Sequence, residues 1–155
     1  MSFRVKGLDA APFQHLYGLS DAALAAQGVK RYVAEPGSRM PDRIELRDAE
    51  PGERMLLLNY VHQPADTPYR ASHAIFVREG AQAAVEVTDA IPQPLLTRPI
   101  SLRAFNAEGE MVEAELADGK DLTPLIDRLF ADPAVDYLQA HYAKRGCYAA
   151  RIERA

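Results

Sequence analysis

The chain has 155 residues, of which 48% are hydrophobic and 26% charged, and its formal net charge is −4. This length and composition are typical of one soluble globular domain, so we expect residues 1–155 to form a single unit. The 18 basic side chains are outnumbered by 22 acidic ones and form no Lys/Arg-rich run, which argues against a nucleic-acid partner. The longest aliphatic run, residues 55–58, is far shorter than the roughly 20 residues of a membrane-spanning helix, so we expect no membrane partner.

The first residues alternate between apolar and polar types and lack the apolar segment and cleavage site of a signal peptide. The single cysteine, Cys147, has no partner for a disulfide within the chain, which agrees with a reducing compartment. We therefore expect a cytoplasmic protein.

The N-terminal third of the chain predicts two strands and two short helices. Residues 3–8 indicate a strand, and residues 9–17 begin with Asp-Ala-Ala-Pro and indicate a short helix. Residues 20–28 have a capping serine, alanines and a terminating glycine, which predict a second short helix. A strand follows at 29–33, and the prolines and glycine of residues 36–41 predict an irregular crossing.

The middle of the chain predicts a hairpin and a third strand. Residues 43–48 alternate as a strand, and the turn at 50–53 has proline and glycine in suitable central positions. Residues 53–62 then read as a strand that is apolar on both faces, and residues 72–79 read as its next neighbour.

The C-terminal part predicts a hairpin, a helix and another hairpin. Residues 100–105 and 111–116 surround a turn that contains glycine, and residues 135–142 and 147–154 surround another. Between them, residues 121–132 carry apolar side chains at the helical period and precede a proline.

These elements predict an α+β fold, because hairpin signals recur and regular βαβ alternation is absent. We expect a mostly antiparallel sheet built from hairpins, with two short N-terminal helices and the helix near residues 121–132 packed on it. Within the strand at 111–116, we expect Val112, Ala114 and Leu116 to face the core and the acidic side chains to face solvent.

Five segments carry a resemblance to a known family, namely residues 43–49, 51–53, 68–72, 75–79 and 146–151. They resemble the bacterial family called domain of unknown function 1203, along the full length of the chain. The resemblance implies a bacterial, single-domain protein and names no reaction. In that family a cysteine often precedes the arginine where this chain has Asp42, and an asparagine often follows the histidine where this chain has Tyr142. A mechanism that needs either residue is therefore in doubt here.

The strongest candidate site lies where the two central strands meet. His62 ends one strand and His73 begins the next, each on a face that is otherwise apolar. If these strands pair antiparallel, both imidazoles lie at one end of the sheet beside Tyr69 and Arg70 of the connection. Arg70 would then bind a carboxylate or phosphate, and the imidazoles would exchange protons near neutral pH.

A structural explanation of the same residues stays open. In it, each histidine is a hydrogen-bonded core residue, and Arg70 pairs with Asp66 or Glu79.

A secondary candidate is the pair His141 and Cys147, which flanks the last hairpin turn, because an imidazole can activate a thiol as a nucleophile. A four-residue loop sends the two side chains to opposite faces, whereas a five-residue loop pairs them directly. A packing role for Cys147 is favoured, since free cysteine is among the most buried residue types. The histidines lack the spacing of metal ligands, and the glycines form no dinucleotide or phosphate loop, so we expect neither a metal nor a cofactor.

The sequence thus names no reaction and leaves three function classes open. The first is a binding protein with a sheet-end pocket for a small anionic molecule. The second is a cofactor-independent enzyme that uses His62 or His73 as general acid or base. The third is a structural or oligomerising protein that binds no ligand, for which a homodimer formed through the sheet edges is one form.

Overall fold

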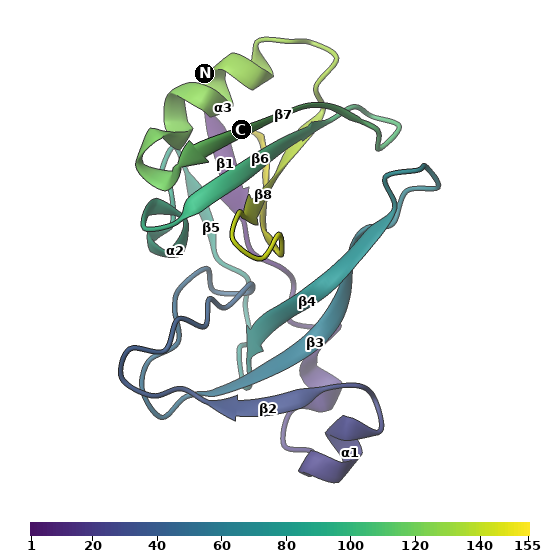
Figure 1. Cartoon of the computed structure of the whole chain (residues 1–155), viewed down its shortest axis with the longest axis vertical. Coiled ribbons are helices and arrows are strands. Elements are labelled where there is room, and N and C mark those ends of the chain that lie inside the picture. Colours follow the sequence, from purple (N-terminus) through teal and green to yellow (C-terminus); the bar gives the residue numbers. More distant parts are fainter.

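The computed structural model describes residues 1–155 and contains two β-sheets whose strand pairs are all antiparallel (Figure 1). The larger sheet has six strands in the order β5-β1-β9-β8-β6-β7, and the smaller has three in the order β2-β3-β4. The strands of the larger sheet are β1 (Phe3–Lys6), β5 (Glu86–Thr88), β6 (Pro99–Phe105), β7 (Met111–Asp118), β8 (Tyr137–Tyr142) and β9 (Tyr148–Arg154). Those of the smaller sheet are β2 (Lys30–Val33), β3 (Arg54–Gln63) and β4 (Ala71–Arg78).

The helices are short and few. They are α1 (Asp21–Ala25), α2 (Gln93–Leu96) and α3 (Leu122–Phe130), with 3₁₀ turns at Gln14–Leu16 and Gly119–Asp121. The α+β class and the antiparallel sheets are thus confirmed. The expected helix count was wrong in detail, because the first N-terminal helix is only a 3₁₀ turn and α2 was not expected.

One face of the larger sheet is covered by α3. Leu122, Ile126 and Leu129 recur at the helical period and pack into the same buried core as strands β1, β6, β8 and β9. The opposite face of this sheet carries Gln139, His141 and Tyr148 and meets the smaller sheet, because Tyr148 belongs to a second core built on β3, β4 and the N-terminal segment. The polar side chains of Gln139 and His141 therefore lie at the junction of the two sheets.

The expected hairpin between residues 43–48 and β3 is wrong. Strand β3 pairs with β2 and β4, and the chain near residue 46 forms a turn in which Leu46 has a φ of 54°. The cause is the buried carboxylate of Asp42, which accepts from the backbone N–H groups of Glu45 and Arg78. These bonds between side chain and backbone replace a strand ladder. The turn at residues 50–53 does form, with a bond from the N–H of Glu53 to the carbonyl of Glu50.

The expected orientation of β7 is also wrong. Leu116 is 71% exposed, and Val112 and Ala114 are exposed as well. The covered face instead carries Glu115, whose carboxylate accepts a hydrogen bond from Arg128 of α3. The reason is that α3 lies on the face opposite to the one that the apolar residues of β7 occupy. No helix in the structure is long and apolar enough to cross a membrane.

Candidate functional site

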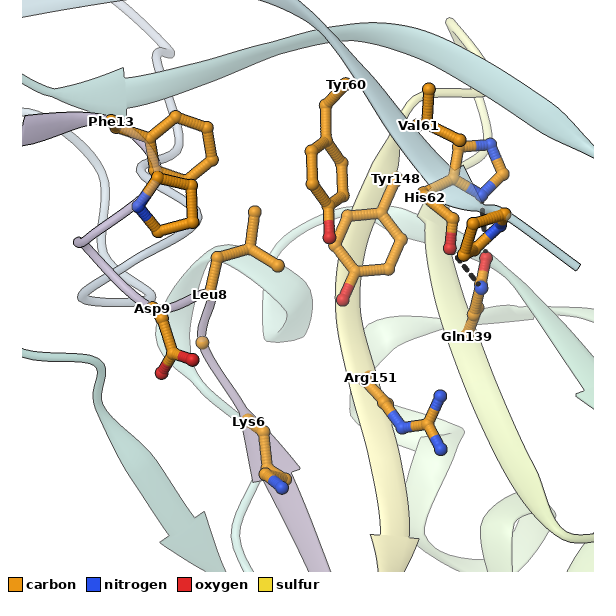
Figure 2. A pocket seen from close by; sticks show the side chains of 13 residues that line it. Lys6, Leu8, Asp9, Phe13, Tyr60, Val61, His62, Gln139, Tyr148 and Arg151 are labelled. Atoms are coloured by element: carbon orange, nitrogen blue, oxygen red, sulfur yellow. Dashed lines mark hydrogen bonds between the residues drawn. The ribbon is translucent and has the colours of Figure 1, made fainter. Parts of the chain in front are cut away.

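A cavity of about 400 Å³ lies at the junction of the two sheets (Figure 2). Its walls come from the end of β1 and the following loop, from β3, and from the neighbouring strands β8 and β9. The lining residues are Lys6, Gly7, Leu8, Asp9, Pro12, Phe13, Tyr60, Val61, His62, Pro64, Gln139, Tyr148 and Arg151.

Aromatic rings form much of the wall. The ring of Tyr148 stacks on His62 at a centroid distance of 5.7 Å and lies 5.7 Å from Tyr60, which in turn lies 6.3 Å from Phe13. Tyr148 is only 4% exposed, yet its hydroxyl reaches the cavity and has no hydrogen-bond partner in the chain (Figure 2). Burial raises the pKa of Tyr60 and of Tyr148, so both hydroxyls stay protonated at neutral pH and act as donors.

The charged groups of the cavity comprise two cations and one free acid. Lys6 Nζ lies 3.2 Å from Glu153 Oε2, and Arg151 Nε lies 2.6 Å from Glu153 Oε1, so the two cations share a single carboxylate. Burial opposes ionisation of Glu153, but the two cations outweigh it and lower its pKa. The guanidinium of Arg151 is also held 3.8 Å above the ring of Tyr137. One positive charge is left in excess at this wall, while Asp9 supplies a negative charge near the Tyr60 hydroxyl.

His62 is fixed by a two-point contact with Gln139. Its Nδ1 lies 2.9 Å from Gln139 Oε1, and Gln139 Nε2 donates to the backbone carbonyl of His62 at 3.0 Å. Since the amide oxygen accepts, Nδ1 carries the hydrogen and Nε2 keeps its lone pair. Burial, partly offset by the bond to Gln139, lowers the pKa of His62, so the ring is neutral near pH 7.

His141 packs edge-on against His62 with ring centroids 4.8 Å apart. Its Nε2 lies 3.0 Å from the same Gln139 oxygen, and its Nδ1 lies 2.9 Å from the carbonyl of Gly146. A neutral ring has one hydrogen and satisfies only one of these acceptors. Burial nevertheless lowers the pKa of His141 to about 3, with the charge of Arg103 acting in the same direction.

The four residues of the predicted site do not all reach the cavity. His62 lines the cavity, and His73 lies opposite Tyr60 in the β3-β4 pair but does not line it. A bulge at His62 interrupts the strand register between Val61 and Gln63, and the charge of His73 still acts on the His62 imidazole. Tyr69 and Arg70 are exposed in the connection and do not line the cavity either.

Neither of the ion pairs suggested for Arg70 forms. Its Nη1 donates to the carbonyl of Pro64 at 2.5 Å, while Glu79 pairs with Arg31 at 2.8 Å. Because Pro64 lines the cavity, Arg70 supports the wall from outside.

The side chains of the secondary candidate pair, His141 and Cys147, do not meet. Tyr142 N donates to Cys147 O at 2.9 Å, which closes the four-residue loop, and His141 pairs with Tyr148 beyond a bulge. Cys147 lies in the core beneath α3, whereas His141 faces the cavity side. No hydrogen bond joins the imidazole of His141 to the thiol of Cys147.

Several cavity residues were not singled out from the sequence, namely Lys6, Tyr60, Gln139, Tyr148 and Arg151. One signal was available for Gln139. It alternates with His141 on a strand whose residues are otherwise apolar, and two polar side chains on one face of a buried strand need partners. The tyrosines carry no such signal, because tyrosine is common in strands.

The fold and the cavity define an α+β protein with an aromatic cavity between two antiparallel sheets. The model of the family described as "Protein of unknown function (DUF1203)" matches residues 39–154, so the chain belongs to this family and the resemblance is confirmed. The cavity wall formed by residues 6–13 lies outside the matched region. No curated protein and no solved structure matches the chain.

Proposed function

We propose that this protein binds a small molecule with an anionic group in the cavity between its sheets. The observation that carries the proposal is the Tyr148 hydroxyl, which belongs to a residue only 4% exposed and faces the cavity without a partner in the chain. This hydroxyl is open to solvent in the cavity, so water accepts from it in the free protein. A ligand oxygen placed there would displace that water.

The cavity walls suggest the kind of ligand. Tyr60, Tyr148 and Phe13 offer flat apolar surfaces to a planar body. Lys6 and Arg151 outnumber the carboxylate of Glu153, which favours a carboxylate or phosphate at that end. A volume of about 400 Å³ falls within the range of small-molecule sites. The free thiol of Cys147 agrees with the bacterial cytoplasm as the location of this function.

An enzyme is the second candidate, and one observation favours it. The contact with Gln139 leaves His62 Nε2 as an acceptor on a neutral ring, which is the state that a general base needs near pH 7. Turnover of a bound ligand that is lost in His62→Gln would support this candidate.

The binding proposal is tested by thermal shift and calorimetry with a panel of aromatic carboxylates and aromatic phosphate esters. A ligand at 100 times its dissociation constant should stabilise the protein by about 2.7 kcal/mol. Arg151→Gln should weaken binding more than tenfold, because a charge-assisted contact contributes about 1.5–3 kcal/mol. Tyr148→Phe keeps the ring and should weaken binding about two- to tenfold.

The matched control is Tyr142→Phe, since Tyr142 is also buried, at 8% exposed, but does not line the cavity. It should leave the affinity unchanged. Equal affinities in the native protein, Arg151→Gln and Tyr148→Phe would refute the proposal, as would the failure of every member of the panel to bind.

A further inference from the structure

Gln139 lies between two arginines on the same face of the larger sheet. In the strand pairs, Arg151 of β9 is opposite Gln139 on one side, and Arg103 of β6 is opposite it on the other. Arg151 lines the cavity and Arg103 does not. Gln139, together with the imidazoles of His62 and His141, therefore separates the cavity from a second cationic position.

Arg103 differs from most arginines of this chain in having no carboxylate partner. Its Nε donates to Ser101 Oγ at 3.2 Å, and its two terminal nitrogens make no hydrogen bond within the chain. Burial alone lowers its pKa, with no acidic group acting against it. By contrast, six other arginines form ion pairs at 2.8 Å or less, namely Arg31, Arg47, Arg78, Arg98, Arg128 and Arg151.

Strand pairing places Arg103 opposite Gln139 and Ser101 opposite His141, so both lie next to the imidazoles. Its charge reaches the imidazoles of His62 and His141, and His73 of β4 acts on the same two rings. No carboxylate is among the charges that act on these two imidazoles. His73 Nδ1 lies 3.0 Å from the carbonyl of Ala74, so Nδ1 is the donor and Nε2 is free.

We propose that Arg103 and Ser101, next to the histidine cluster of His62, His73 and His141, form a second ligand site, which binds an oxyanion of the phosphate or carboxylate class. The two free terminal nitrogens of Arg103 match the oxygen spacing of such groups. Ser101 accepts from Arg103 Nε, so its own hydroxyl hydrogen is available to the anion. The anion supplies the negative charge that this partly desolvated cluster lacks. The site does not depend on the ligand proposed for the cavity.

The probes are inorganic phosphate and, in a separate titration, acetate, at constant ionic strength balanced with chloride. The reporter is the imidazole of His73 in the NMR spectrum of the full chain, because His73 does not line the cavity. A saturable shift of His73 is expected with phosphate, acetate or both, and the stronger of the two identifies the class. Arg103→Gln should weaken this binding at least tenfold, which corresponds to about 1.4 kcal/mol.

Two controls make the result specific. Arg39→Gln removes the same charge at an exposed residue whose only hydrogen bond is to Thr97 O at 3.4 Å, and it should leave the affinity unchanged. Arg151→Gln should also leave the His73 response unchanged, even where it abolishes binding in the cavity. The proposal is overturned if His73 shows no saturable shift with either anion, if Arg103→Gln binds as the native protein does, or if Arg39→Gln loses as much affinity. If Arg103→Gln does not fold, Arg103→Lys decides, since a lysine cannot bind through a planar fork and unchanged affinity would refute the site.

Discussion

The guanidinium of Arg43 donates from Nη2 to the Sγ of Cys147 at 3.2 Å, in a junction where Arg43 is 2% and Cys147 9% exposed. The same guanidinium donates to the carbonyls of Pro41 at 2.6 Å and Tyr148 at 2.8 Å. One buried arginine thus links the segment before β3 to the start of β9. Because Tyr148 begins β9 and lines the cavity, this link also holds the cavity wall in place.

Cys147 is expected to be structural. Cys147→Ser should lower the free energy of unfolding by about 1–2 kcal/mol in urea denaturation, because a hydroxyl would enter an apolar core and the contact with Arg43 would change. Binding in the cavity should persist. Cys147→Ala is the control that removes the sulfur without adding a polar group. A native thiol that reacts with iodoacetamide as fast as the unfolded chain would contradict the structural role.

His141 should make the protein less stable in acid. Its pKa falls from 6.5 to about 3 on folding, because burial, supported by Arg103, disfavours the charged ring. Between these two pKa values the unfolded chain binds a proton that the native protein does not bind. The free energy of unfolding is therefore unaffected by His141 above pH 6.5 and decreases as the pH falls toward about 3. Urea denaturation at several pH values should show this slope, and His141→Gln should flatten it.

An NMR titration of His141 provides the independent check. Both ring nitrogens face acceptors, Gly146 O and Gln139 Oε1, and these would favour the charged ring. If His141 titrates at or above its ordinary value of 6.5, the two acceptors outweigh burial and the predicted slope disappears.

Glu53 contributes to stability at a lower pH. Arg47 donates to its two oxygens at 2.7 Å each, and this bidentate contact is the main reason that the pKa of Glu53 falls from 4.5 to about 2. A lowered acid pKa gives stability that is present above pH 4.5 and lost as the pH falls toward about 2. Glu53→Gln should reduce the pH dependence in this window. Glu50→Gln, at an exposed position with no ion pair, is the control, and an equal effect of both substitutions would refute the assignment.

Gly109 is expected to be required where the tips of the β3-β4 and β6-β7 hairpins touch. An added Cβ at Gly109 would lie 2.4 Å from Ala65 Cβ, whereas at Gly18 it would meet nothing within 4 Å. The φ values are similar, +81° and +75°, so both alanine substitutions carry a comparable backbone cost of about 1–2 kcal/mol. Gly109→Ala should cost about 1–3 kcal/mol more than Gly18→Ala in thermal unfolding, because the tips must separate. Equal losses would show that the contact does not stabilise the protein.

Local patterns in the sequence predicted most of the elements. Strands β3, β4, β6, β7, β8 and β9 and helix α3 all lie within or next to the ranges expected from apolar periodicity and turn residues. The wrong expectation at residues 43–48 has a physical cause that local patterns do not reveal. The strand expected at 43–48 was replaced by a turn because the Asp42 carboxylate took two backbone donors, one of them on Arg78, which lies far along the chain.

The candidate site depended even more on contacts between distant parts of the chain. The sequence indicated that His62 lies on an otherwise apolar face, because alternation along one strand is a local property. It contained no local sign that Tyr60 would meet Tyr148, or that Gln139 would lie between Arg151 and Arg103. These relationships depend on the register between β8, β9 and β6 and on the packing of one sheet against the other. The sequence by itself therefore determined the strands, the main helix and the polar residues placed on apolar faces, whereas only the tertiary structure decided which of those residues meet, because register and sheet packing are set by contacts between distant parts of the chain.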